Sequence, residues 1–201
     1  MIDIKFPEPP NSQDKLFTSA DDWTNACLNF FHDGWTLYAM GYMDAADILV
    51  EYIERHGQHG RQQDSLVYPI IFLYRQYLEL SLKDLIQQAR KYLDDPTPFP
   101  QHHRIDELWK LCDRLLEQIS PGDSAEYRKE ISRLMEEFAQ VDPLSMSFRY
   151  PEDKDGNPTL PGLANINMRN VKEVIGKISV ILEGAGALIY EGLSYRSEMG
   201  P

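Results

Sequence analysis

Residues 64–93 read DSLVYPIIFLYRQYLELSLKDLIQQARKYL, and this stretch decides the fold class. Apolar side chains recur at helical spacing over its whole length and cover most of the circumference of a helix. Its one proline, Pro69, falls in the first turns, where a missing N–H does least harm. A helix of about 30 residues is about 45 Å long. The pattern therefore predicts a central helix, packed on several faces, that defines the long axis of the domain.

Helical spacing continues on both sides of this segment. The further expected helices cover residues 18–31, 35–55, 103–119, 124–140 and 167–193. With the central helix they predict an all-α fold, an antiparallel helical bundle of about six helices joined by short connections. The bundle is expected to form a single domain over residues 18–195. An N-terminal arm (1–17) precedes it and a C-terminal tail (196–201) follows.

Residues 141–165 interrupt the helical pattern. The segment is rich in proline and glycine, and two short stretches at 147–151 and 158–160 flank an Asp-Gly-Asn sequence at 155–157. An Asp-Gly pair in this setting favours a hairpin turn. We therefore expect one irregular, hairpin-like insertion. A loop of this length inside a compact domain is more often functional than idle.

The chain is acidic. It has 20 Lys and Arg against 32 Asp and Glu in 201 residues, which gives a formal net charge of −12. Its longest basic runs are the pairs Arg90-Lys91 and Arg128-Lys129. Because a phosphate backbone is repelled by such a surface, no extended nucleic-acid binding is expected. Any anionic ligand must be small and held locally.

The sequence shows no membrane span and no secretory leader. The apolar stretches at 67–74 and 178–182 are too short to cross a bilayer. The N-terminus lacks a basic region followed by an apolar core, so a cytoplasmic protein is expected. Cys27 and Cys112 are the only cysteines, and we expect both thiols to stay reduced.

Charged residues form a stripe along the central helix. Arg75, Glu79 and Lys83 are spaced i, i+4, i+8, so they share one side of a helix that is otherwise apolar nearly all round. The stripe either faces a cleft, where it could bind a ligand, or forms a solvated ridge with two intrahelical ion pairs. The sequence leaves both interpretations open.

A second candidate lies in the irregular insertion. Arg149 stands between Phe148 and Tyr150 in a segment bounded by Pro143 and Pro151. An arginine among aromatic side chains can bind a phosphate or carboxylate, or stack on a base. It could equally pair with a nearby acid and fix the loop.

Paired carboxylates raise the alternative of a metal-dependent enzyme. Glu51 and Glu54 are one helical turn apart, the spacing with which all-α nucleotide hydrolases hold magnesium. Such a site needs a Glu-x-x-Asp pair on another helix. The only such pair, Glu152 with Asp155, lies in the insertion. We therefore predict no metal site, no cofactor and no assigned catalytic residue, and keep the hydrolase as an alternative function.

The segment YRQYLELSLKDLI at 74–86, a proline-bearing loop, and HRIDELW at 103–109 together resemble the HEPN superfamily of small all-α prokaryotic domains. The resemblance implies a helical bundle, frequently dimeric, in families tied to RNA cleavage, nucleotide binding or phage defence. Active ribonucleases of that superfamily carry an Arg, a spacer of four to six residues, and a His. No Arg in this chain has a His five to seven positions later.

The resemblance therefore predicts a HEPN-like module that lacks the ribonuclease motif and is more an interaction module than an enzyme. We expect it to bind a small anionic ligand, such as a nucleotide or an RNA end, or to bind a protein partner, either another protein or a second copy of this chain. A bacterial defence or toxin–antitoxin-type context would fit such a module. A purely structural dimerisation protein is a further alternative. We expect the HEPN-like module to bind through one cleft with Arg75, Glu79, Lys83, His103 and Arg149 around it. The candidate ligand-binding residues are these five and Tyr150.

Overall fold

The computed structural model describes residues 8–28, 34–56 and 61–199. The chain divides into two units, Met1–His32 and Asp33–Pro201, and each is described by itself. The described residues contain five helices and no strand, so the all-α fold class is confirmed. The predicted boundary between arm and domain at residue 17 stays a prediction.

The first unit has no helix over residues 8–28. The helix expected over 18–31 is therefore wrong for 18–28, and residues 29–31 lie outside the described part. Oδ1 of Asp22 accepts a hydrogen bond from the N–H of Thr24 at 2.8 Å, and Oδ1 of Asn25 accepts one from the N–H of Ala20 at 3.0 Å. Such local bonds offer the backbone an alternative to the helix. Trp23 is exposed, so no packed apolar face stabilises a helix here.

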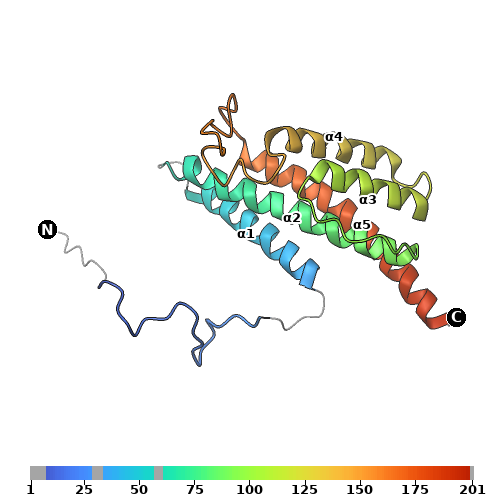
Figure 1. Cartoon of the computed structure of the whole chain (residues 1–201), viewed down its shortest axis with the longest axis horizontal. Coiled ribbons are helices and arrows are strands. Elements are labelled where there is room, and N and C mark those ends of the chain that lie inside the picture. Colours follow the sequence, from blue (N-terminus) through green and yellow to red (C-terminus); the bar gives the residue numbers. More distant parts are fainter. Residues whose placement is uncertain (1–7, 29–33, 57–60, 200–201) are drawn as a thin grey trace. The chain divides into compact units, whose positions relative to one another are not determined.

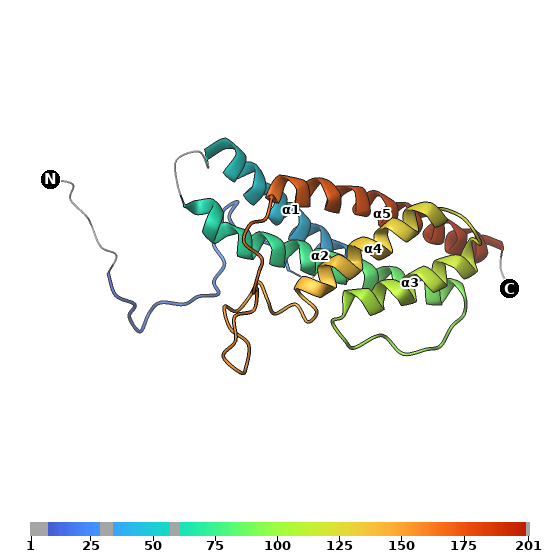
Figure 2. The same cartoon turned by 90° about the horizontal axis from the view of Figure 1, so that it is seen from above.

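The second unit is a bundle built around one central helix. Its helices are α1 (Gly34–His56), α2 (Gln62–Tyr92), α3 (Ile105–Ile119), α4 (Ala125–Val141) and α5 (Met168–Met199). α2 packs against α1, α3 and α5, and α4 packs on α3 (Figures 1 and 2). Buried side chains follow α2 from Ile70 to Arg90. The prediction of a central helix packed on several faces is therefore confirmed, whereas the described residues contain five helices in place of about six.

The connection between α2 and α3 decides the direction of α3. Nη1 of Arg90, near the end of α2, donates to the carbonyl of Pro98 at 2.6 Å. Further along the connection, Nδ1 of His103 lies 2.7 Å from Oε1 of Glu79, in the middle of α2. The chain therefore returns along α2, and α3 then runs in the same direction as α2 (Figure 1). The expectation of antiparallel neighbours with short connections is wrong for this pair.

α1 and α2 are antiparallel neighbours, as expected. Oγ1 of Thr36 donates to Oδ2 of Asp84 at 3.3 Å, and the hydroxyl of Tyr74 donates to Oδ1 of Asp47 at 2.6 Å. Burial raises the pKa of the Tyr74 hydroxyl well above its ordinary value, and the hydrogen bond and negative charge of Asp47 add to the rise. The tyrosine therefore stays a neutral donor to the Asp47 carboxylate.

α5 extends through Met199, so residues 196–199 of the expected tail are helical. Arg196 contacts the end of α2: its Nη1 donates to the carbonyl of Tyr92, and its guanidinium lies 4.2 Å from the centre of the Tyr92 ring. A Cβ placed on Gly192 would collide with that ring. The small size of Gly192 is therefore required where the two helices approach, whereas Gly184 faces open space.

The segment between α4 and α5, residues 142–167, contains no helix. One isolated antiparallel bridge joins Glu152 and Pro158 around Gly156, whose φ is +80°. Within this turn, Oδ1 of Asp153 accepts a hydrogen bond from the N–H of Asn157 at 2.9 Å. The chain thus reverses at the Asp-Gly sequence, whereas the hairpin-like form of the insertion stays a prediction.

Candidate functional site

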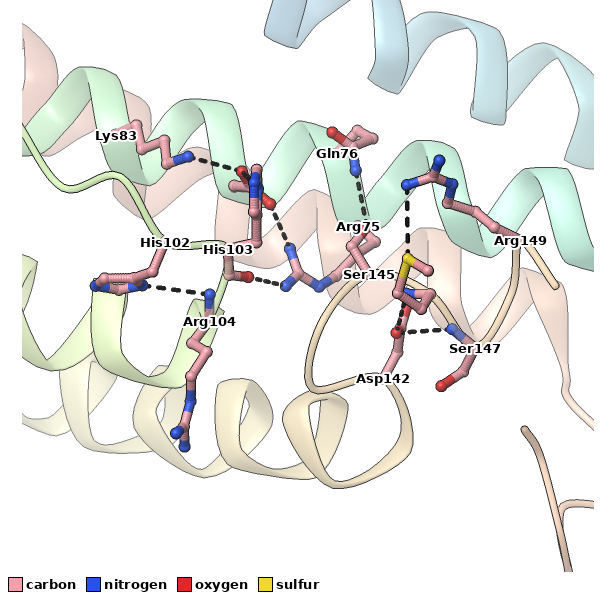
Figure 3. Close-up of polar contacts among 12 residues, drawn as sticks. Arg75, Gln76, Lys83, His102, His103, Arg104, Asp142, Ser145, Ser147 and Arg149 are labelled. Atoms are coloured by element: carbon pink, nitrogen blue, oxygen red, sulfur yellow. Dashed lines mark hydrogen bonds and ion pairs between the residues drawn. The ribbon is translucent and has the colours of Figure 1, made fainter. Parts of the chain in front are cut away.

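A buried polar cluster surrounds Glu79 in the middle of α2. Oε1 of Glu79 accepts hydrogen bonds from Nζ of Lys83 at 2.8 Å and from Nδ1 of His103 at 2.7 Å. Oε2 pairs with Nη1 of Arg75 at 3.2 Å, and Nη2 of Arg75 donates to the backbone carbonyl of His103. Figure 3 shows Arg75, Lys83 and His103 converging between α2 and the start of α3. The structure thus brings together four of the predicted site residues.

Solvent reaches this cluster only at its edge. The exposed fraction of the side chain is 0% for Arg75, 4% for Glu79 and 7% for Lys83, but 62% for His103. The connection from α2 to α3 covers the stripe, and Nζ of Lys83 lies 5.7 Å from the centre of the Phe99 ring. The stripe is therefore not a solvated ridge, although the two intrahelical ion pairs expected in that interpretation are present.

The charges of the cluster compensate one another. Burial alone would raise the pKa of Glu79. Hydrogen bonds from Lys83 and His103, with the charges of Lys83 and Arg75, outweigh burial and bring the pKa of Glu79 below its ordinary value. Burial lowers the pKa of the Arg75 guanidinium, while the charges of Glu79 and Asp142 act in the opposite sense. Both cations are thus engaged within the chain, and neither is presented to an external anion.

His103 is the accessible member of the cluster. Because an ionised carboxylate can only accept, the Nδ1–H of His103 donates to Glu79, and this contact fixes the orientation of the ring. An imidazole oriented by a carboxylate can transfer a proton or bind a metal. Among the described residues, no other side chain forms a hydrogen bond with the ring. The geometry therefore defines an imidazole that is oriented by a buried carboxylate.

Asp142, at the C-terminal end of α4, is a buried carboxylate that sequence reasoning missed. Its Oδ1 accepts hydrogen bonds from the N–H groups of Met146 at 2.7 Å and Ser147 at 3.0 Å (Figure 3). The residue is fully buried, and its negative charge acts on Arg75. Asp142 thus connects the insertion electrostatically to the cluster on α2. An Asp-Pro pair at a helix end was the available signal, and it also occurs in ordinary turns.

Arg149 and Tyr150 lie apart from the buried cluster, and Figure 3 shows Arg149 beyond Gln76 along α2. The Arg149 guanidinium lies 5.5 Å from the centre of the Phe72 ring and 5.2 Å from that of Tyr150. Its Nη2 donates to the Tyr150 hydroxyl at 3.3 Å, and its Nη1 lies 3.9 Å from Sδ of Met146. The described part of the chain places no carboxylate in ion-pair contact with it. The six predicted residues therefore occupy two places and not one cleft.

Glu51 and Glu54, the carboxylates of the hydrolase alternative, pair with cations of α5. Nζ of Lys172 lies 2.8 Å from Oε1 of Glu51, and Nε of Arg169 lies 2.5 Å from Oε1 of Glu54. Within residues 8–28, 34–56 and 61–199, no three His, Cys, Asp or Glu side chains are grouped so that they could hold a metal ion. The two glutamates thus join α1 to α5.

Two cavities border these features. One of about 960 Å³ is formed mainly by the insertion, and Asp142 and Tyr150 line it together with both apolar and polar side chains. The other, of about 300 Å³, lies between α2, α4 and α5 and is lined mainly by apolar residues such as Phe138 and Ile175. Arg75, Glu79, Lys83 and His103 line neither of these two cavities.

The structure defines an all-α bundle with an internal ion cluster and a separate, exposed arginine. No family model, curated protein or solved structure matches the chain. In the part of the chain that the structure describes, no helix is long and apolar enough to cross a membrane. The function of this bundle therefore has to be argued from its own residues.

Proposed function

We propose that the chain is a HEPN-like helical module without the ribonuclease motif that binds a small anionic ligand, a nucleotide or an RNA end, at Arg149. One observation carries the proposal. The exposed Arg149 guanidinium is held against the rings of Phe72 and Tyr150, and it has no carboxylate partner among the described residues. In a chain with a net charge of −12, an arginine that is oriented yet unpaired is available to a ligand.

The chemistry of this arginine suits an anion with a planar part. A guanidinium presents five N–H donors in a fixed fork that matches a phosphate or carboxylate. The contacts with Tyr150 and Met146 leave several of those donors for a ligand. Tyr150 is 45% exposed, so its ring offers a surface on which a base could stack. Because the two rings already orient the side chain, a ligand would pay little ordering entropy on binding.

In this proposal the other four predicted residues do not contact the ligand. Arg75, Glu79, Lys83 and His103 hold the connection from α2 to α3 in place. Arg75 and Asp142 then couple that region to the start of the insertion that carries Arg149. The cluster is thus a positioning element, and the proposed module binds a ligand without assigned catalysis.

Calorimetric titration of the full chain with adenosine monophosphate and with inorganic phosphate tests the proposal. We expect Arg149→Gln to weaken nucleotide binding by about 10- to 100-fold, because a hydrogen bond to a charged group contributes about 1.5–3 kcal/mol. Arg149→Lys keeps the charge but loses the fork, so it should also bind more weakly. Arg133→Gln is the matched control, since Arg133 is exposed on α4 and paired with Glu130 and Glu137.

Two results would contradict the proposal. One is a wild-type chain that gives neither heat nor a thermal shift with either probe. The other is an Arg149→Gln variant that binds as tightly as Arg133→Gln. Binding of phosphate and nucleotide with equal affinity would identify the phosphate group as the part recognised, and stronger binding of the nucleotide would add stacking on Tyr150.

A protein partner is the second candidate, and exposed apolar residues on α1 favour it. The hydrolase alternative has no comparable support, because its two glutamates pair with Lys172 and Arg169. The bacterial defence context and the cytoplasmic setting remain parts of the proposal. The free thiols of Cys27 and Cys112 are compatible with a reducing compartment.

A further inference from the structure

Apolar side chains border the cavity between α2, α4 and α5. Leu78 of α2 and Ile175 of α5 are only 1% and 3% exposed, and both line it. Phe138 of α4 and Val174 of α5 also line it and are partly buried. Leu163, near the end of the insertion, borders it as well. Three helices and a loop thus surround about 300 Å³ that no side chain of the described residues fills.

The packing of the helices explains why this space is open. α4 packs on α3 and α5 packs on α2, whereas α4 and α5 make few contacts with each other. Protein interiors are normally packed as densely as organic crystals, and an unfilled apolar space lowers stability. This space has the volume of about ten molecules of liquid water. Water would find few hydrogen-bond partners against the apolar lining, so an apolar molecule is the better occupant.

The polar side chains that line the cavity are all exposed, and they are those of Glu137, Asn165, Asn167 and Asn170. Oδ1 of Asn167 accepts a hydrogen bond from the N–H of Asn170 at 3.2 Å. The side-chain amides of Asn165 and Asn170 have no hydrogen-bond partner among residues 8–28, 34–56 and 61–199. Because an amide offers both donors and an acceptor, the two can bind a hydroxyl or a carbonyl group. The edge of the cavity is therefore polar, whereas its interior is apolar.

We propose that this cavity binds an uncharged molecule with an apolar chain of about ten heavy atoms and one hydroxyl or carbonyl end. The chain would fill the apolar interior, and the polar end would meet the amides of Asn165 and Asn170. Such a site, mostly apolar with a few polar groups that fix orientation, is the usual form of a small-molecule pocket. A carboxylate end is disfavoured, because Glu137 lines the cavity and the chain has a net charge of −12. Arg149 does not line this cavity, so the inference is independent of the proposed anion site.

Calorimetric titration of the full chain with straight-chain primary alcohols tests the proposal. From butanol through hexanol to octanol, we expect the affinity to rise about fourfold for each added methylene group, which is the effect of burying one such group. The rise should level off near decanol, because the volume of the cavity limits the chain length. Octanoate has the same chain length as octanol but carries a charge, so it should bind more weakly.

Val174→Phe tests the location of the site. The larger side chain would occupy part of the cavity, so octanol should bind more than about tenfold more weakly, the effect of two or more methylene groups left unburied. Because the substitution fills a cavity, the thermal midpoint should not fall. Val180→Phe is the matched control: Val180 is also on α5 but is 66% exposed and does not line the cavity.

A second variant tests the polar end and leaves the apolar interior intact. Asn165→Ala combined with Asn170→Ala should weaken octanol binding by about fivefold, the usual effect of one lost neutral hydrogen bond. The proposal is overturned if the wild-type chain binds none of the alcohols, or if the affinity does not depend on chain length. It is also overturned if Val174→Phe binds octanol as tightly as Val180→Phe does. Octanoate binding that is tighter than octanol binding and is lost in Val174→Phe would overturn the assignment of an uncharged ligand.

Discussion

Glu79→Gln is the substitution that most directly tests the buried cluster. Gln has nearly the shape of Glu, but its amide carries no charge and has a single acceptor oxygen. The side chains of Arg75 and Lys83 are 0% and 7% exposed, so the variant leaves two buried cations without the carboxylate that pairs with both of them. Removal of one partner from a buried ion pair typically costs about 3–5 kcal/mol. We expect a loss of about that size in the free energy of unfolding.

Urea unfolding followed by circular dichroism at 222 nm measures the loss. A typical domain is stable by about 5–15 kcal/mol, so the variant should still fold, with a lower midpoint and an unchanged m-value. Glu137→Gln is the matched control, because Glu137 is 69% exposed and its ion pair with Arg133 spans one helical turn. Exposed pairs contribute less than about 1 kcal/mol. A Glu79→Gln loss no larger than that of Glu137→Gln would refute the reasoning.

The difference in stability between the wild-type chain and Glu79→Gln should depend on pH with a defined sign. The pKa of Glu79 is lowered in the folded chain, so its carboxylate stabilises the fold above the usual glutamate pKa of about 4.3. That contribution is lost as the pH falls through the lowered folded value. The stability difference between wild type and Glu79→Gln should therefore be fully present above the usual glutamate pKa and should narrow progressively as the pH falls below it. A difference that stays constant as the pH falls would mean that the charge of Glu79 is not what stabilises the cluster.

Two further predictions concern packing. Gly192→Ala should lower the free energy of unfolding by about 1 kcal/mol, because the overlap of the new methyl group with the Tyr92 ring outweighs the gain in helix propensity. Gly176 faces open space, so Gly176→Ala should raise the free energy of unfolding by about 0.5–1 kcal/mol. Equal effects of the two substitutions in thermal or urea unfolding would contradict the contact between Gly192 and Tyr92. Burial raises the pKa of the Cys112 thiol, so a thiol-reactive dye should modify only Cys27 in the folded chain and should modify Cys112 after unfolding. Rapid modification of both thiols in native buffer would contradict the burial of Cys112 in α3.

Much of the fold could be predicted because its signal is local. The apolar residues of 64–93 repeat with the period of a helix, and that period requires only neighbouring residues to be read. The same rule failed at 18–28. Trp23, Cys27 and Phe30 share helical spacing, but a short helix also needs a surface on which to pack, and Trp23 is exposed. The direction of α3 also escaped prediction, because it depends on contacts such as that of Arg90 with Pro98.

The candidate site, like the fold, could be predicted from the sequence only in part. The spacing of Arg75, Glu79 and Lys83 places them on one side of α2 whatever surrounds the helix. Whether that side is solvated or buried depends on where residues 93–104 pass, and the spacing does not contain that information. The buried carboxylate of Asp142 was missed for the same reason, since its effect on Arg75 requires the insertion to fold back onto α2.

The sequence by itself determined the helical class, the central place of residues 64–93, and the choice of candidate residues, which it placed around one cleft. These properties follow from the period of one helix and from the charges of individual side chains. Only the tertiary structure decided that Arg75, Glu79, Lys83 and His103 form a compensated internal cluster, while Arg149 is left exposed and unpaired. The physical reason is that an ion pair and a binding site use the same residue types. Burial and the presence of a partner distinguish them, and both are set by contacts between residues far apart in the chain.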